Sequence, residues 1–344
     1  MLLIHLFALL GILLFAFAYL GTILNGKLPK YFFSFMILTA FAIRLGAAAL
    51  SKGFGSDMAC FAAWSDRIWQ VRPGGFYSPE IFTDYPPGYM YVLWLLGWFR
   101  QLFQIEYYST AHLILLKLPA IFCDIACGVL LYREASRRLS QTQAAFVSLA
   151  YLLNPAVILN SSVWGQVDSI LALLVALMCL YLIHGRMYAA YIVFGIGVLV
   201  KPHMLIFGPV ILAGFLDHVI LNGFPAKPGS RNAALLANRV LHSCIRILTV
   251  IIGMIILCLP FGLENVWKQY FSTVTSYPYA AVNACNFWGL FGLNWVSQDN
   301  TFLGIPYRVF GWSAIALSVA AVLYVSLRNR ERQEKYPFLG ALII

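Results

Sequence analysis

Apolar windows long enough to cross a lipid bilayer recur along almost the whole chain, and they constrain its fold more than any other feature. A transmembrane helix needs about 20 mostly apolar residues. The windows that meet or nearly meet this length are 2–24, 31–50, 88–103, 110–132, 144–162, 168–184, 188–216, 244–262 and 306–326. We therefore predict an all-α polytopic membrane protein, a bundle of about 9–11 transmembrane helices.

The composition agrees with a protein that exposes most of its surface to lipid. Of its residues, 61% are apolar and only 10% are charged, whereas an average globular chain is about 45–50% apolar and about 25% charged. The 23 Lys and Arg residues outnumber the 13 Asp and Glu residues, and in short membrane loops such an excess marks the cytosolic side. We predict a multi-pass integral protein of the cell membrane, in contact with membrane lipid, and do not expect nucleic acid as a partner.

The positions of the basic residues predict which segments face the cytosol. Lys and Arg gather at Lys27, Lys30, Arg133, Arg137, Arg138, Arg186, Lys227, Arg231, Arg239, Arg246, Arg328, Arg330, Arg332 and Lys335. Segment 217–243 is then a polar cytosolic loop, and the aromatic segments 51–87 and 263–305 face the other side. The first window is too long for the apolar part of a signal peptide and lacks its basic start, so we expect a retained helix.

Two windows depart from the simple pattern. If 88–103 and 110–132 both crossed, Arg133 and the basic residues after it would lie outside, so we expect that 88–103 does not cross fully. Lys201, Pro202 and His203 interrupt the window 188–216, which predicts two half-spans or one broken helix. We treat 1–344 as a single transmembrane domain, and expect it to be truncated at its C-terminus because a last apolar run stops after a few residues.

The first external segment contains a predicted amphipathic helix. Ser56 is a suitable N-cap, and Asp57, Phe61, Trp64 and Ile68 follow at the spacing of one helical face. The helix should end at the Pro-Gly-Gly sequence that begins at Pro73. Asp57 heads the apolar face, which fits a general base equally well as a carboxylate that caps a helix N-terminus.

Ionisable residues inside apolar windows suggest function, because they are costly in a membrane. Lys117 and Asp124 lie on one face of 110–132, and they either neutralise each other or serve the site. Lys201 and His203 flank a helix-breaking proline, where an anionic ligand such as a phosphate is the natural partner of the cation. The alternative for Lys201 is a side chain that reaches the interface. Arg44 is expected to extend to the interface in the same way.

A polar block stands where the window 144–162 ends and the next begins. Trp164, Gln166 and Asp168 offer an indole, an amide and a carboxylate within five positions. Such groups can bind a sugar by stacking and hydrogen bonding, and they equally fit an interfacial aromatic residue followed by a helix cap. Sequence alone favours sugar binding only slightly.

Taken in order, these blocks resemble a known superfamily. The blocks are SDMACFAAW, DYPPGY, KLPAIFCD, NPAVILNSSVWGQVDS, VKP and VNACNFWGL, and they extend over nearly the whole chain from about Lys30. They resemble the GT-C glycosyltransferases, most closely the bacterial and archaeal proteins related to the GPI-anchor mannosyltransferases, and more distantly the dolichol-linked glucosyltransferases. The resemblance implies a bundle of the GT-C type with Asp57 as catalytic base.

The resemblance also implies roles for other residues. Tyr85 and Pro86 match a motif that shapes the site, Trp164, Gln166 and Asp168 match a second block, and Lys201 matches a third. The paired Asp-x-Asp of some relatives is absent, because Asp57 and Asp66 lie far apart. We therefore predict no metal and no cofactor.

The implied reaction is an inverting transfer of a hexose, mannose or glucose, from a polyprenyl-phosphate carrier to a glycan, lipid or protein acceptor on the extracytoplasmic face. Such a transfer needs a base for the acceptor hydroxyl, for which Asp57 is suited, and positive charge for the departing phosphate. The cations proposed for the phosphate are Lys201, His203, Arg67 and Arg72. The alternative is a transporter or flippase of a lipid-linked saccharide, although the chain lacks the paired half-repeats of many transporters.

Overall fold

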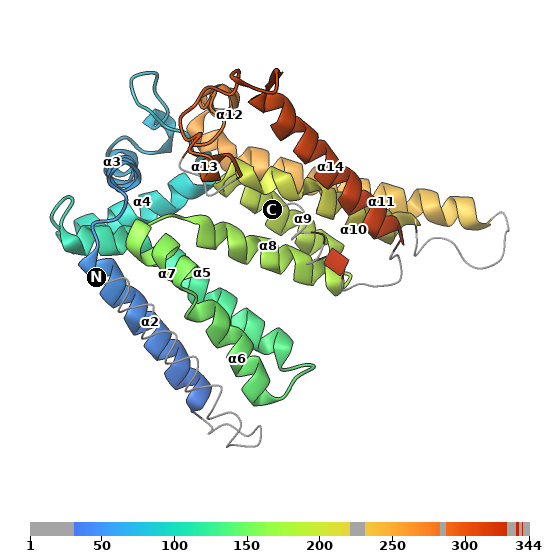
Figure 1. Cartoon of the computed structure of the whole chain (residues 1–344), viewed down its shortest axis with the longest axis horizontal. Helices are drawn as coiled ribbons and strands as arrows, with labels where there is room; N and C mark the ends of the chain where they lie inside the picture. Colours follow the sequence, from blue (N-terminus) through green and yellow to red (C-terminus); the bar gives the residue numbers. More distant parts are fainter. Residues whose placement is uncertain (1–30, 221–230, 283–286, 329–334, 337–338, 340–344) are drawn as a thin grey trace. The chain divides into compact units, whose positions relative to one another are not determined.

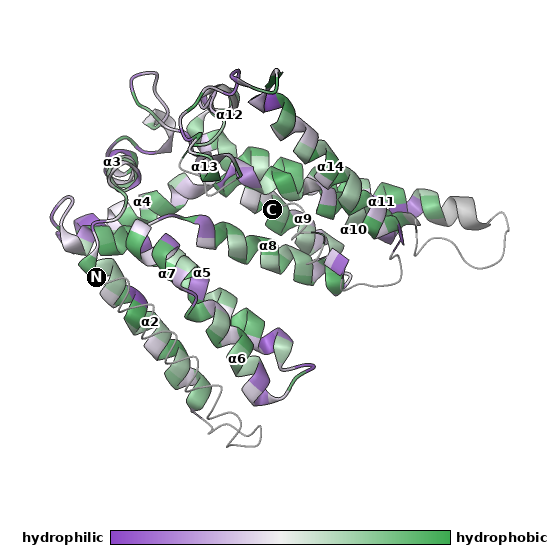
Figure 2. Cartoon of the chain, in the orientation of Figure 1, coloured by the Kyte–Doolittle hydropathy of each residue, from purple (hydrophilic) through white to green (hydrophobic). Residues whose placement is uncertain are grey.

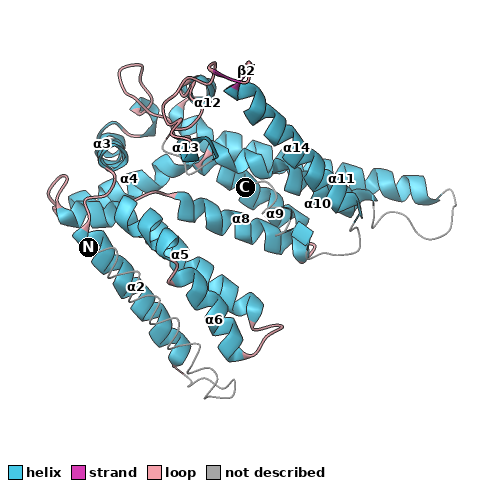
Figure 3. Ribbon diagram, in the orientation of Figure 1, coloured by secondary structure: helices cyan, strands magenta, loops and turns pink. Residues whose placement is uncertain are grey.

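The computed structural model describes residues 31–220, 231–282, 287–328, 335–336 and 339, and the regular secondary structure of this part is almost entirely helical (Figures 1 and 3). The α-helices are α2 (Phe32–Leu50), α3 (Gly55–Val71), α4 (Pro87–Leu102), α5 (Thr110–Ala135), α6 (Gln141–Leu152), α7 (Pro155–Ile158), α8 (Asp168–Ile183), α9 (Met187–Val200), α10 (Gly208–Ile220), α11 (Arg231–Cys258), α12 (Leu263–Thr275), α13 (Phe287–Leu290) and α14 (Tyr307–Arg328). Short helices of other types are η1 (Pro73–Gly75), η2 (Leu159–Trp164), η3 (Pro202–Phe207) and η5 (Leu259–Phe261). Two short strands, β1 (Thr301–Phe302) and β2 (Ile305–Pro306), pair antiparallel.

The long helices are apolar enough to cross a membrane (Figure 2). Within the described residues, five segments meet that length and composition: Phe32–Leu50, Thr110–Ala135, Pro202–Val219, Leu236–Phe261 and Tyr307–Arg328. A sixth span forms if α6 and the segment Pro155–Trp164, which meet at 45°, are counted together. The predicted all-α polytopic membrane protein is confirmed. The number of 9–11 spans stays a prediction, since the window 2–24 lies outside the described residues.

The two irregular windows are also visible in the structure. Helix α4 has 16 residues, so it rises about 24 Å and falls short of the hydrocarbon core of about 30 Å. Its expected failure to cross stays a prediction. The break in 188–216 is present, because α9 ends at Val200 and Lys201 is extended before η3 begins at Pro202.

The connecting segments contain more helix than their composition suggests. Segment 217–243 is not one loop: α10 continues to Ile220 and α11 starts at Arg231, on either side of ten residues that lie outside the described part. In 51–87, α3 forms as expected and ends before Pro73, but it starts at Gly55 with Phe54 as its N-cap. The prediction of Ser56 as the N-cap was therefore wrong.

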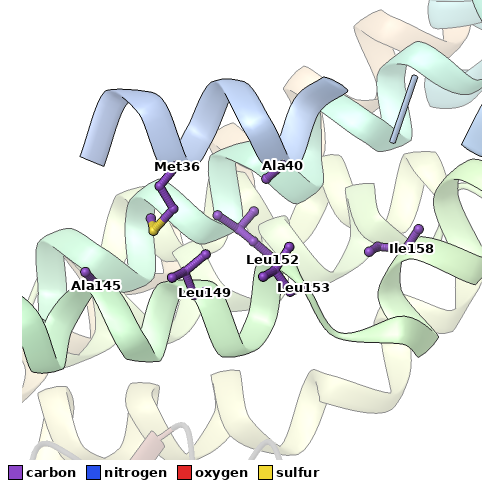
Figure 4. Packing of buried hydrophobic residues seen from close by; sticks show 7 residues of the cluster. All are labelled: Met36, Ala40, Ala145, Leu149, Leu152, Leu153 and Ile158. Atoms are coloured by element: carbon purple, nitrogen blue, oxygen red, sulfur yellow. The ribbon is translucent and has the colours of Figure 1, made fainter. Parts of the chain in front are cut away.

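The described residues divide into two compact units, the first within 1–72 and 90–174 and the second within 73–89 and 175–344. The first unit has an apolar core between α2 and α6 (Figure 4). Its members are Met36, Ala40, Ala145, Leu149, Leu152, Leu153 and Ile158. Small residues let membrane helices approach closely. Gly128 of α5 shows this, because a Cβ there would lie 2.5 Å from the Leu152 side chain.

In the second unit, the start of α4 packs against the end of α9. A Cβ at Gly88 would lie 2.6 Å from the backbone of Leu199, so only glycine allows this approach. The Phe76 and Tyr77 rings pack against Phe261, with centroids 6.4 Å and 5.6 Å away. This packing fixes the segment that leads to Tyr85 beside the end of α9.

Candidate functional site

Asp57 lies in the first turn of α3, half-buried, and receives two hydrogen bonds on one carboxylate oxygen. Trp164 Nε1 donates to Asp57 Oδ2 at 2.9 Å, and Gln166 Nε2 donates to the same atom. No described residue donates a hydrogen bond to Oδ1. A negative charge is also favoured in the first turn of a helix by about 0.3–1 kcal/mol. The carboxylate is thus held through one oxygen, and the other remains open.

The two donors are positioned by a short π-helix, η2, and the turn after it. Gly165 adopts φ +91°, and its N–H and that of Gln166 both donate to Asn160 O, at 3.0 Å and 2.9 Å. Only glycine adopts this conformation without strain, and a Cβ there would lie 2.4 Å from Met58 Sδ. The turn therefore aims residues 164 and 166 toward α3.

The residues just before α3 secure the same turn. Phe54 N–H donates to Trp164 O at 2.8 Å, and the two rings lie 4.8 Å apart. Ser51 Oγ donates to Val163 O at 2.8 Å. These bonds tie the linker between α2 and α3 to the end of η2, so Asp57 and its donors belong to one rigid arrangement.

Lys117 stabilises this arrangement through contacts with the C-terminal end of α2. Its side chain is fully buried in α5, and Nζ donates to Ser51 O at 2.7 Å and to Ala48 O at 3.3 Å. An ammonium at these carbonyls complements the negative end of the α2 dipole. The mutual neutralisation of Lys117 and Asp124, one of the two interpretations above, was therefore wrong, because each side chain has another partner.

Asp124 pairs with Arg44 inside the first unit. Arg44 Nε lies 3.1 Å from Asp124 Oδ2, and neither side chain is exposed. Ser161 Oγ donates to Asp124 Oδ2 at 2.6 Å, and Arg44 also donates to Leu152 O at 2.8 Å. The expectation that Arg44 reaches the interface was wrong. Two opposite charges within apolar windows were the signal for this pair.

The remaining candidates of the first unit lie nearby in the chain but have different surroundings. Asp168 heads α8 and accepts a hydrogen bond from Asn160 Nδ2 at 3.3 Å. Arg67 is half-buried on α3, and the exposed Arg72 lies over the Trp69 ring, 4.8 Å from its centroid. The hydrogen bonds to Asp57 come from Trp164 and Gln166, and the role of Arg67 and Arg72 at a phosphate stays a prediction.

The second unit contains the other group of candidates. Lys201 is half-buried, with Nζ 5.7 Å from the centroid of the Tyr85 ring. Tyr77 OH donates to Tyr85 O at 2.9 Å, and burial raises the pKa of Tyr77 above its ordinary value of 10.0, so it remains a neutral donor. Pro86 is buried and His203 is exposed. The structure brings together Tyr85, Pro86 and Lys201.

Residues of α12 and of the loop after it contact the segment before Tyr85. The sequence analysis did not predict these contacts. Thr83 Oγ1 donates to Gln269 Oε1 at 2.9 Å, and Gln269 Nε2 donates to Thr83 O. Tyr277 OH donates to Asp84 Oδ2 at 2.8 Å. These contacts join positions about 190 residues apart in the chain, and no local pattern indicates them.

Within the described part of the chain, no group of three or more His, Cys, Asp and Glu side chains is arranged to hold a metal ion. The predicted independence from metal stays a prediction.

Comparison with protein families gives a match to part of the chain. The sequence model of glycosyltransferase family 87 matches residues 82–216. This segment includes Tyr85, Trp164, Gln166 and Lys201 but not Asp57. The match supports a membrane glycosyltransferase, whereas the specific resemblance to the GPI-anchor mannosyltransferases is not confirmed. Comparison with curated proteins gives no significant match.

Proposed function

We propose that the protein is an inverting hexosyltransferase. It moves mannose or glucose from a polyprenyl-phosphate carrier to a glycan, lipid or protein acceptor on the extracytoplasmic face of the cell membrane. The observation that carries the proposal is the Asp57 carboxylate, with Oδ2 held by Trp164 and Gln166 and Oδ1 open to an incoming group. The family match over 82–216 supports the same class of reaction.

Asp57 acts as the general base. Oδ1 takes the proton of the acceptor hydroxyl as the acceptor oxygen forms a bond to the anomeric carbon of the hexose. The bond from that carbon to the phosphate oxygen breaks in the same step, and the polyprenyl phosphate departs with the electron pair. A single displacement inverts the anomeric configuration. Bases positioned in this way contribute about 10²–10⁴-fold to a rate.

Positive charge stabilises the departing phosphate. Lys201 is the first candidate, because a half-buried ammonium beside an aromatic ring and a helix break favours an anionic ligand. His203, Arg67 and Arg72 are further candidates. A phosphate monoester anion is a weak base, so the reaction needs no strong general acid.

Trp164 contacts both the Asp57 carboxylate and the sugar ring of the substrate. Its Nε1 is engaged with Asp57, while 36% of the residue is exposed. An exposed indole provides an apolar surface on which a sugar ring stacks. Gln166 and Asp168 complete the polar surroundings of this face, and Lys117 and Asp124 shape the site through the contacts that hold α2, α5 and η2 together.

The test compares the full-length protein with Asp57→Asn in membranes that contain radiolabelled polyprenyl-phosphate mannose or glucose. We expect turnover with one of the two donors by the unsubstituted protein, and a loss of at least about 100-fold in Asp57→Asn. Donor binding should be retained by the variant. The product should have the inverted anomeric configuration, which NMR of the glycosidic linkage reports.

Glu80→Gln is the matched control, because it removes an exposed carboxylate from the same external segment. It should leave turnover unchanged. Donor binding without turnover in the unsubstituted protein would contradict a transferase and favour a lipid-linked saccharide transporter. Equal turnover by Asp57→Asn would remove Asp57 as the base.

A further inference from the structure

Helix α12 (Leu263–Thr275) has two chemically different sides. Leu263, Trp267 and Phe271 recur every four residues and therefore share one side. They are 45%, 67% and 58% exposed. Large apolar side chains aligned in this way are unusual on a surface that faces only water.

A neighbouring side of α12 makes the tertiary contacts. Val266 is buried, Gln269 binds Thr83 through two hydrogen bonds, and Tyr270 OH donates to Val198 O at 2.8 Å. Burial raises the pKa of the Tyr270 phenol above 10.0, which keeps it a neutral donor. These bonds fix the rotation of α12 about its axis and leave Leu263, Trp267 and Phe271 exposed.

Helix α12 directly follows a segment that is long and apolar enough to cross a membrane. The span Leu236–Phe261 precedes it, and Ile255 and Leu259 of that span are exposed apolar residues. Gly262, at φ +78°, lets the chain turn between the two helices. Because the span ends at Phe261 and α12 begins at Leu263, α12 starts where the chain leaves the apolar part of the membrane.

We propose that α12 is an interfacial helix that inserts Leu263, Trp267 and Phe271 into the phospholipid layer. The polar residues beside this side support the orientation, because Glu264 and Lys268 form an exposed ion pair at 2.7 Å that stays in water. Trp residues concentrate at membrane interfaces, where apolar rings enter the boundary of headgroups and acyl chains. The partner is phospholipid, and this proposal does not depend on transferase activity.

The test places the photoreactive amino acid benzoylphenylalanine at Trp267, with Lys268 as the matched control position. Lys268 is also exposed, and it is the neighbouring residue on the polar side of the helix. The full-length variants are reconstituted in phosphatidylcholine nanodiscs, irradiated and analysed by mass spectrometry. We expect phospholipid adducts at position 267 at least fivefold more abundant than at position 268.

A second labelled position tests whether lipid contact extends along the helix or is confined to residue 267. Benzoylphenylalanine at Phe271 should give lipid adducts like those at Trp267. Equal adduct yields at 267 and 268, or no lipid adduct at 267 in a monodisperse protein, would overturn the proposal. Cross-linked dimers in place of lipid adducts would also overturn it, because a second copy would then occupy this surface.

Discussion

Both donors on Asp57 reach the same carboxylate oxygen, and neither needs to touch the sugar to affect catalysis. The sequence suggested that Trp164 and Gln166 bind substrate, whereas their contacts also fit the positioning of a base. The two roles differ in their kinetic effects. Loss of a positioning group lowers kcat, while loss of a group that binds the substrate in its ground state raises KM.

Replacement of Gln166 by Leu, or of Trp164 by Phe, should lower kcat about 10–100-fold with a smaller change in KM. A hydrogen bond to a charged group contributes about 1.5–3 kcal/mol, which corresponds to this range. Trp164→Phe keeps a ring beside Phe54 and removes only the Nε1 donor. Steady-state kinetics with the preferred donor checks the prediction. A rise in KM at constant kcat would assign both residues to sugar binding instead.

At the scale of the elements, the buried Arg44–Asp124 pair joins α2 to α5 and, through Ser161, to η2. Removing one partner of a buried ion pair costs about 3–5 kcal/mol, since the other charge remains without compensation. Arg44→Met should therefore lower the melting temperature of the purified protein clearly. The double variant Arg44→Met with Asp124→Asn should recover part of the loss, because no charge is left unpaired. Equal melting temperatures of Arg44→Met and the unsubstituted protein would contradict the pairing.

Tyr77, in the segment before α4, should make the stability of the folded protein sensitive to alkaline pH. Burial raises the pKa of Tyr77 above 10.0, so the folded protein keeps a proton that the unfolded chain releases. The stabilisation is complete below about pH 10 and is lost as the pH rises further. The melting temperature should fall as the pH rises from about 10 to about 12, and Tyr77→Phe should show a smaller fall. An identical fall in Tyr77→Phe would exclude this residue as a source.

For the whole molecule, the side of the membrane on which each segment lies is the main open prediction. In a variant without native cysteines, a cysteine at Lys52 should react with an impermeant thiol reagent added outside intact cells. A cysteine at Arg137 should react only after permeabilisation, because the basic cluster is predicted to be cytosolic. Both positions are exposed. External labelling of both would mean that α4 crosses the membrane fully.

Much of the helical framework could be predicted from the sequence, because lipid requires long apolar helices and these leave a continuous signal. The break at Lys201 and the face of Asp57, Phe61, Trp64 and Ile68 were also readable, since proline position and helical period are local properties. Phe61, Trp64 and Ile68 are indeed buried. Local patterns therefore predicted the elements and the residues that carry polar chemistry.

The partners of those residues could not be predicted. Asp57 meets Trp164 across 107 positions of the chain, and Arg44 meets Asp124 across 80. Such contacts depend on how the helices pack against one another, and the periodicity of the sequence carries no information about that packing. The π-helix η2 and the left-handed Gly165 that aim Trp164 toward Asp57 also leave no periodic signal, because they depart from the regular helix by one extra residue.

The separation of Arg44 and Asp124 has a consequence for biosynthesis. Ribosomes add about 5–20 residues per second, so the 80 positions between the two side chains correspond to roughly 4–16 s of synthesis. During that time α2 holds an arginine in the bilayer without its counter-ion. Measurements of helix insertion into membranes give a cost of about 2.5–3.5 kcal/mol for an arginine at the centre of a helix. Arg44 can be neutralised by Asp124 only after α5 has been synthesised, so this step of folding has to wait for translation.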